Sequence, residues 1–227
     1  MLASGRGEVN LRPDLAVIAD HVAPRARVLD VGCGDGALMA ALRDEKQVDA
    51  RGLEIDAGNV AAAVARGLSV IQGDADVDLA GYPDASFDYA ILSQTLQTAR
   101  APHVVLDHLL RIGARAFVSF PNFAHWRTRL SLLWGGRMPV TRLLPEEWFD
   151  TPNIHHVTID DFRAFLAKRG VVVERAWFLS RGVETSAAAA NLLAEHAVFL
   201  LRRGNGRSET EIGGTSEGAA GSRRNVS

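Results

Sequence analysis

The stretch Val28-Leu29-Asp30-Val31-Gly32-Cys33-Gly34-Asp35-Gly36 joins a short apolar run to three glycines at alternate positions. The apolar run predicts a buried strand, and the glycines predict a sharp turn into a helix whose inward face is Leu38, Ala41 and Leu42. Glycine lets the backbone approach a bound group closely, and the free N–H groups at a helix start favour an anionic ligand group. We therefore expect a ligand site at this turn.

Length and composition indicate a soluble globular chain with one core. The chain has 227 residues, of which 47% are hydrophobic and 23% charged. Its net charge of −2 does not favour nucleic acid or an anionic membrane surface as a partner. The single cysteine, Cys33, excludes an internal disulfide, and no apolar run is long enough for a membrane span. The first 20 residues lack the pattern of a signal peptide, so we expect a cytoplasmic protein.

Strand and helix patterns alternate along most of the chain. Strands are expected at 27–31, 48–54, 68–71, 87–92, 114–120, 171–179 and 197–202. Helices are expected after Pro13, after Gly36, after Asp56, at 102–112, at 125–134 and after Thr158. The segment 73–86 is expected to be a loop, and 180–194 a longer connection between the last two strands. Such alternation predicts a mostly parallel sheet with helices on both faces and a ligand site at the carboxyl ends of the strands.

The domain is expected to cover residues 11–202, between a loose N-terminus at 1–10 and a disordered tail at 203–227. Residues 121–153 interrupt the alternation and are interpreted as an insertion over the carboxyl edge of the sheet. Its predicted helix carries Trp126 and Trp134. We consider two interpretations: a lid whose apolar face covers the sheet, or a docking surface for a protein or an acidic ligand, built with Arg127, Arg129, Arg137 and Arg142.

Polar side chains fall where four of the predicted strands end: Asp30, Glu54, Asp74 and Ser93. Glu54 follows Gly32 by 22 residues, close to the spacing of roughly 20 at which an acid accepts hydrogen bonds from a ribose. This spacing fits a cofactor that contains adenosine. The glycine pattern differs from the G-x-G-x-x-G of dinucleotide sites, since the third glycine comes one position early, and this disfavours a nicotinamide-dependent oxidoreductase.

Four segments resemble, in the same order, the motifs of class I S-adenosylmethionine-dependent methyltransferases: Asp30–Gly36, Gly52–Asp56, Gly73–Ala75 and Phe87–Leu92. The resemblance implies a doubly wound, Rossmann-like, mostly parallel seven-stranded sheet with an antiparallel C-terminal hairpin. It also implies S-adenosylmethionine or S-adenosylhomocysteine as the ligand. Glu54 would hold the ribose hydroxyls, Ile55 would pack on the adenine, and Asp74 would accept from the adenine amino group. The methionine end would lie against Asp30, Gly32, Gly34 and Gly36, with Ala75 and Ser93 completing the set.

A closer resemblance, to the methionine biosynthesis family MetW, is carried by three further segments. These are Leu92–Gln97, Val118–Phe123 followed by His125-Trp126, and Phe149–His155. The resemblance implies an accessory or regulatory role beside homoserine O-acyltransferase, which activates homoserine in methionine synthesis.

The alternative is an active methyltransferase on a small oxygen or carbon acceptor, with residues 121–153 lining the acceptor pocket. Many amine-directed enzymes of this class carry Asn or Asp, two prolines and an aromatic where this chain has Ser93-Gln94-Thr95-Leu96, which disfavours an amino acceptor. No residue can be assigned as a catalytic base. The spacings of His103 with His108 and of His155 with His156 do not suit metal ligands on one face, so no metal site is predicted.

Overall fold

The structure is a computed structural model that describes residues 11–141 and 144–204. The loose N-terminus expected at 1–10, the tail from residue 205 onward and Arg142 lie outside the described residues.

One twisted sheet forms the centre of the fold, with strands in the order β3-β2-β1-β4-β5-β8-β6-β7. The strands are β1 Arg27–Val31, β2 Asp49–Glu54, β3 Ser69–Gln72, β4 Phe87–Ser93, β5 Gly113–Pro121, β6 Val172–Ser180, β7 Val183–Glu184 and β8 His196–Arg202. Strands β1 to β5 pair in parallel, whereas β8 pairs antiparallel with both β5 and β6. The predicted doubly wound sheet with its antiparallel C-terminal hairpin is confirmed.

The sheet has eight strands where seven were predicted, because the expected connection at 180–194 contains the two-residue strand β7. Arg181 and Gly182 both have positive φ, which turns the chain tightly so that β7 pairs back onto the end of β6. A two-residue strand carries no alternation of apolar and polar residues, so periodicity did not reveal it.

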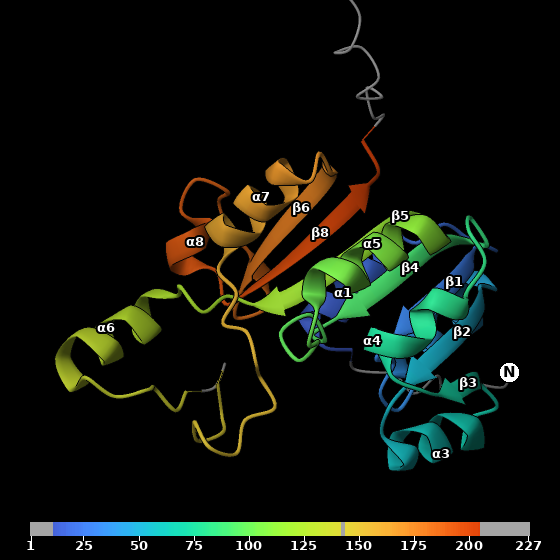
Figure 1. Cartoon of the computed structure of the whole chain (residues 1–227), viewed down its shortest axis with the longest axis horizontal. Helices are drawn as coiled ribbons and strands as arrows, with labels where there is room; N and C mark the ends of the chain where they lie inside the picture. The colour runs from blue at the N-terminus through green and yellow to red at the C-terminus, as the bar shows by residue number, and fades with distance from the viewer. Residues whose placement is uncertain (1–10, 142–143, 205–227) are drawn as a thin grey trace, which may run out of the picture.

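Helices cover both faces of the sheet (Figure 1). The described residues form the helices α1 Pro13–His21, α2 Ala37–Lys46, α3 Ala57–Ala65, α4 Ala75–Asp78, α5 Pro102–Ile112, α6 Trp126–Gly135, α7 Ile159–Lys168 and α8 Ala190–Leu193. Two expected helix starts are confirmed by their caps: Asp56 accepts from the Asn59 N–H, and Thr158 accepts from the Asp161 N–H. Within these described residues, no helix has the length and apolar content needed to cross a membrane.

The segment 73–86 is not the unstructured loop that was expected. It contains α4 and a 3-10 turn at Leu79–Gly81, and Asp74 caps α4 by accepting from the Asp76 N–H. Leu79 is fully buried against the core. The helical segments are too short for an apolar repeat, so the prediction of a loop was wrong.

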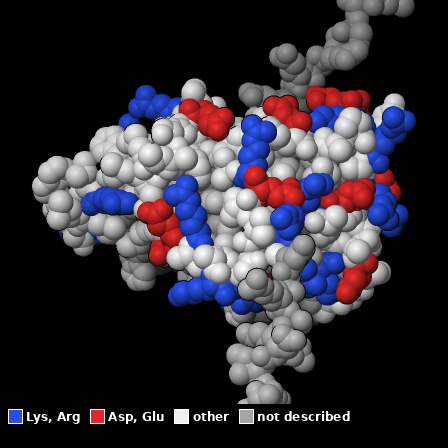
Figure 2. Space-filling model, turned by 90° about the horizontal axis from the view of Figure 1, so that it is seen from above, with Lys and Arg blue, Asp and Glu red and all other residues white. Residues whose placement is uncertain are grey.

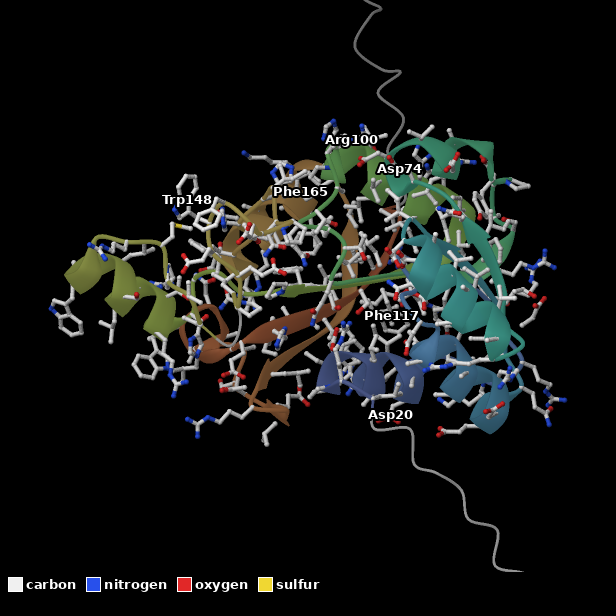
Figure 3. All side chains as sticks on the ribbon, turned by 90° about the horizontal axis from the view of Figure 1, so that it is seen from below. Asp20, Asp74, Arg100, Phe117, Trp148 and Phe165 are labelled. Atoms are coloured by element: carbon white, nitrogen blue, oxygen red, sulfur yellow. The ribbon has the colours of Figure 1, made fainter. Side chains whose placement is uncertain are left out.

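Side chains of the central strands alternate between two cores. Leu29 and Val31 of β1 belong to the cluster that includes α5, whereas Val28 belongs to the cluster that includes α1 and α2. Phe117 of β5 lies within the second cluster, near the middle of the molecule in Figure 3. The same alternation directs Asp30 toward α1, which decides its environment in the site.

Helix α6 begins close to its predicted start, since His125 caps it, but it does not cover the sheet. It projects from the end of β5 and stands apart from the other helices (Figure 1). Leu133 and Trp134 are 75% and 79% exposed. The interpretation as a lid with its apolar face on the sheet is therefore corrected: the face that was expected to be buried meets solvent.

Candidate functional site

A hollow lies outside the carboxyl ends of the parallel strands, where the strand order reverses between β1 and β4. The residues around it come from the ends of all four strands on this side: Gly32 after β1, Leu53 and Ile55 at β2, Gly73, Asp74, Ala75 and Asp76 after β3, and Thr95, Thr98 and Ala99 after β4. Of the residues predicted to bind a cofactor, Gly32, Ile55, Asp74 and Ala75 line this hollow.

The three glycines of the turn all have positive φ but differ in their surroundings. A Cβ on Gly34 would meet no atom within 4 Å, so this position is open. A Cβ on Gly36 would come within 2.3 Å of Leu68, and one on Gly32 within 2.3 Å of the Thr95 hydroxyl oxygen. Gly36 is therefore needed for helix packing, and Gly32 for the close approach of the segment after β4.

Glu54 joins the end of β2 to the glycine turn. One carboxylate oxygen accepts from the Gly34 N–H at 2.8 Å, and the other accepts from the Asp56 N–H at 2.9 Å. The side chain is buried, although Ile55 beside it is 64% exposed. A carboxylate has about four lone-pair sites, so Glu54 keeps acceptor capacity for a ligand.

Asp74 and Asp76 receive the cationic side chain of Arg100, which follows β4. The Asp74 carboxylate and the Arg100 guanidinium lie 2.5 Å apart (Figure 3), and Arg100 also approaches Asp76 at 3.5 Å. Burial acts to raise the pKa of Asp76, but the N–H groups of Arg100 and Ala101 and the Arg100 charge together hold it below its ordinary value. Asp76 is thus held in its ionised form at the rim of the hollow.

Asp30 is a buried carboxyl behind the turn. Burial raises its pKa to about 7; the Arg12 charge opposes this rise and the Glu54 charge adds to it. Within the described part of the chain, its side chain forms no hydrogen bond, which leaves a carboxyl at the glycine turn without a partner.

Ser93 does not line the hollow. The alternation of β4 points it to the α1 face, where its hydroxyl donates to Asp14 at 3.0 Å and accepts from Arg12 at 2.9 Å. Ser119 of β5 also donates to Asp14, at 2.9 Å. Burial acts to raise the pKa of Asp14, but Arg12 and these hydroxyls hold it below its ordinary value. Ser93 is therefore committed to a buried polar cluster that ties α1 to the sheet.

Sequence reasoning missed the residues after β4 that line the hollow, Thr95, Thr98 and Ala99. A hydrogen bond joins two of these residues: the Thr98 hydroxyl donates to the Thr95 carbonyl at 2.8 Å. The sequence carries no signal for these residues, because they approach Gly32 only through the parallel pairing of β1 with β4.

Gln97, in the same turn, joins the chain segment around His155. Its carbonyl accepts from the Ile154 and His155 N–H groups at 2.8 and 3.0 Å. The Gln97 side-chain oxygen and the His155 Nε2 are both buried, and neither has a hydrogen-bond partner among the described residues. Two unsatisfied polar atoms thus lie in segments that are joined by backbone hydrogen bonds.

Cys33 is a small residue packed in the turn. Burial raises the pKa of its thiol, so it is not an activated nucleophile. In the described residues, no group of three or more His, Cys, Asp or Glu side chains is placed to hold a metal ion.

Comparison with known proteins places the chain in a family. The family described as Methionine biosynthesis protein MetW matches residues 12–201. The chain belongs to the MetW family. A relative from Rhodopirellula baltica, "Bifunctional methionine biosynthesis protein MetXA/MetW", is 33% identical over 210 residues, which cover 87% of this chain and 34% of the relative.

Other similarities point to methyltransferases. A "Ubiquinone biosynthesis O-methyltransferase" from Xylella fastidiosa is 39% identical over 132 residues, which cover 53% of this chain and 51% of the relative. The chain thus spans about a third to a half of the length of these relatives. An S-adenosylmethionine-dependent methyltransferase structure from Mesorhizobium loti superposes with a TM-score of 0.64 at 17% identity, over 86% of this chain and all of the other. The MetW chain therefore has the methyltransferase fold.

Asp30 is expected to make stability depend on pH. Its pKa in the folded chain is about 7 against an ordinary value of 3.8, so the folded state holds a proton that the unfolded state loses. Stability from this group is complete below pH 4 and falls as pH rises through 7, by up to roughly 4 kcal/mol at ~1.4 kcal/mol per pH unit.

Urea unfolding of wild type and Asp30→Asn between pH 4 and pH 8.5 measures this effect. The wild type should lose stability relative to the variant across that range, because Asn does not titrate. Parallel curves for the two proteins would show that Asp30 ionises normally.

Proposed function

We propose that this chain binds S-adenosylmethionine in the hollow outside β1, β2, β3 and β4 and acts as an accessory partner of homoserine O-acyltransferase in methionine biosynthesis. The cofactor would lie with its adenosine against the ends of β2 and β3 and its methionine end at the glycine turn.

The residues around the hollow fit the chemistry of this cofactor. Gly34 leaves open space at the turn, and the unpartnered carboxyl of Asp30 can oppose the positive charge of the ammonium or sulfonium group. Glu54 retains lone pairs for the ribose hydroxyls. The exposed Ile55 offers an apolar surface for the adenine, and Asp74 has acceptor sites beyond those used by Arg100 and the Asp76 N–H. The proposal does not use Ser93, whose hydroxyl is already bonded.

Glu54→Ala should weaken S-adenosylmethionine binding about 10- to 100-fold, the range expected for the loss of charged hydrogen bonds of ~1.5–3 kcal/mol. Isothermal titration calorimetry checks this. Ile55→Ser should weaken binding without changing thermal stability, because its side chain is exposed and supports no packing.

The matched control is Asp49→Asn, an exposed acid at the opposite end of β2. It should bind the cofactor like wild type. Undiminished binding by Glu54→Ala would remove Glu54 from the ribose role.

The relative from Rhodopirellula baltica supports the proposal that this chain has a protein partner. MetXA and MetW form one chain in the Rhodopirellula protein, and joining two proteins in this way keeps them at high effective concentration. Membership of the MetW family, together with this fusion, supports association with the acyltransferase.

Co-expression with homoserine O-acyltransferase should yield a complex in size-exclusion chromatography, and the acyltransferase activity should differ with and without this chain. The Glu54→Ala variant tests whether the cofactor site affects that activity. Absence of both a complex and an activity change would overturn the proposed partnership.

The second candidate is methyl transfer to a small oxygen or carbon acceptor. Two observations favour it: the partial similarity to an O-methyltransferase, and the buried atoms of Gln97 and His155 that have no hydrogen-bond partner among the described residues. Each atom could bond a hydroxyl of an acceptor, because an amide oxygen accepts and an imidazole nitrogen can accept or donate.

Transfer of a labelled methyl group to a metabolite extract tests this candidate. If it is correct, a labelled product should form with wild type, fall at least 10-fold with Gln97→Leu, and disappear with Glu54→Ala. Cofactor binding without any product would count against methyl transfer and would leave the accessory role in place.

A further inference from the structure

Helix α6 and the segment after it form an arm, defined here as residues 126–141, that presents apolar side chains to solvent. Leu133 and Trp134 near the end of α6 are the most exposed of these. Trp126, Met138 and Val140 are also exposed by more than a third. Single exposed apolar residues are common, but a continuous group of large ones on a projecting element indicates an interaction surface.

The arm is fixed at its base, so it presents a defined surface. The Arg129 guanidinium donates to the Ala124 carbonyl at 2.6 Å, and Thr128 is fully buried. Gly136 in the left-handed conformation ends the helix, and its N–H donates to the Leu132 carbonyl at 3.0 Å. A preformed surface loses less conformational entropy on binding than a disordered segment.

A second apolar segment continues the same surface. Trp148 and Phe149 are both exposed and pack edge to face, with ring centroids 5.5 Å apart. Trp148 lies at the outer edge of the molecule beside the arm (Figure 3). It also lines a shallow hollow with Met138 and Val140 of the arm, which joins the two segments into one patch.

The charged residues of the arm are all basic, whereas the exposed acids Glu146, Glu147 and Asp150 flank Trp148 and Phe149. Residues 126–141 contain Arg127, Arg129 and Arg137 and no acidic residue. The end of the molecule that carries α6, on the left in Figure 2, is largely uncharged and shows separate basic side chains with a group of acidic ones beside them. Arg127 stacks over the Trp126 ring at 5.3 Å. Aromatic residues with arginine are the composition typical of the energetically dominant part of a protein interface.

We infer that the arm, together with Trp148 and Phe149, is the surface that docks homoserine O-acyltransferase. This inference rests on the proposed partnership and adds the location of the interface. The relative in which MetXA and MetW share one chain argues for that occupant. The arm requires a complementary face with an apolar centre and acidic residues at its rim. None of its residues lines the hollow at the ends of β1 to β4, and α6 projects beyond the end of β5 (Figure 1), so both sites can be occupied together.

The full chain with Leu133→Ser and Trp134→Ser tests the inference. Both side chains are exposed, so folding and S-adenosylmethionine binding should match wild type, whereas affinity for purified homoserine O-acyltransferase should fall at least 10-fold. Arg137→Glu should weaken the complex. The affinity of this variant should also depend less on salt concentration than that of wild type, because an attraction that salt screens is removed. Val64→Ser, an exposed apolar residue on α3, is the matched control and should bind the acyltransferase like wild type.

The outcomes separate the two proposals. A complex with wild type that the arm variants leave unchanged would overturn the inference and keep the partnership. No complex with wild type would overturn the partnership and, with it, the assigned surface. Self-association of wild type in sedimentation velocity that the arm variants abolish, with acyltransferase binding unchanged, would overturn the inference in favour of a second copy of this chain.

Discussion

The hydrogen bond from the Gly34 N–H to the Glu54 carboxylate holds together the part of the fold on which the site depends. It joins the glycine turn after β1 to the end of β2, while the second Glu54 oxygen accepts from the Asp56 N–H at the start of α3. The parallel sheet continues from β1 toward β2 and β3 on one side and toward β4 and β5 on the other. The link therefore fixes the glycine turn relative to β2, at the point where the strand order reverses. The same carboxylate is thus a structural brace and the proposed ribose acceptor.

A second polar arrangement, around Asp14, ties α1 to the sheet. Asp14 of α1 accepts from Ser93 and Ser119, and Arg12 contributes the balancing charge. Buried carboxylates are tolerated when hydrogen bonds and a nearby cation offset their desolvation. Asp30, on the same face, has no side-chain hydrogen bond within residues 11–141 and 144–204, and burial raises its pKa. The hydrogen bonds of Asp14 are thus used to hold α1 on the sheet, whereas the Asp30 carboxyl is the one that we propose for a ligand.

The molecule separates its two proposed functions in space. The hollow lies at the switch point of the sheet, where the fold supplies acids and glycine turns. The arm extends beyond the end of β5, where its apolar residues are not needed for the core (Figure 1). Because the two surfaces are separate, a ligand and a protein partner can be bound at the same time. The proposed role as an accessory protein that binds a cofactor requires this.

The sequence by itself determined the strands of the parallel half, the glycine turn and the acids at the strand ends, because these features follow from local periodicity and residue chemistry. Only the tertiary structure decided the rest. Strand alternation turned Ser93 away from the hollow and toward Asp14, the pairing of β1 with β4 brought Thr95 onto Gly32, and α6 left the sheet uncovered. Each of these outcomes depends on which elements become neighbours in space. Helical spacing places Leu133 and Trp134 on one face of α6, but it does not show whether that face packs on the sheet or is exposed to solvent.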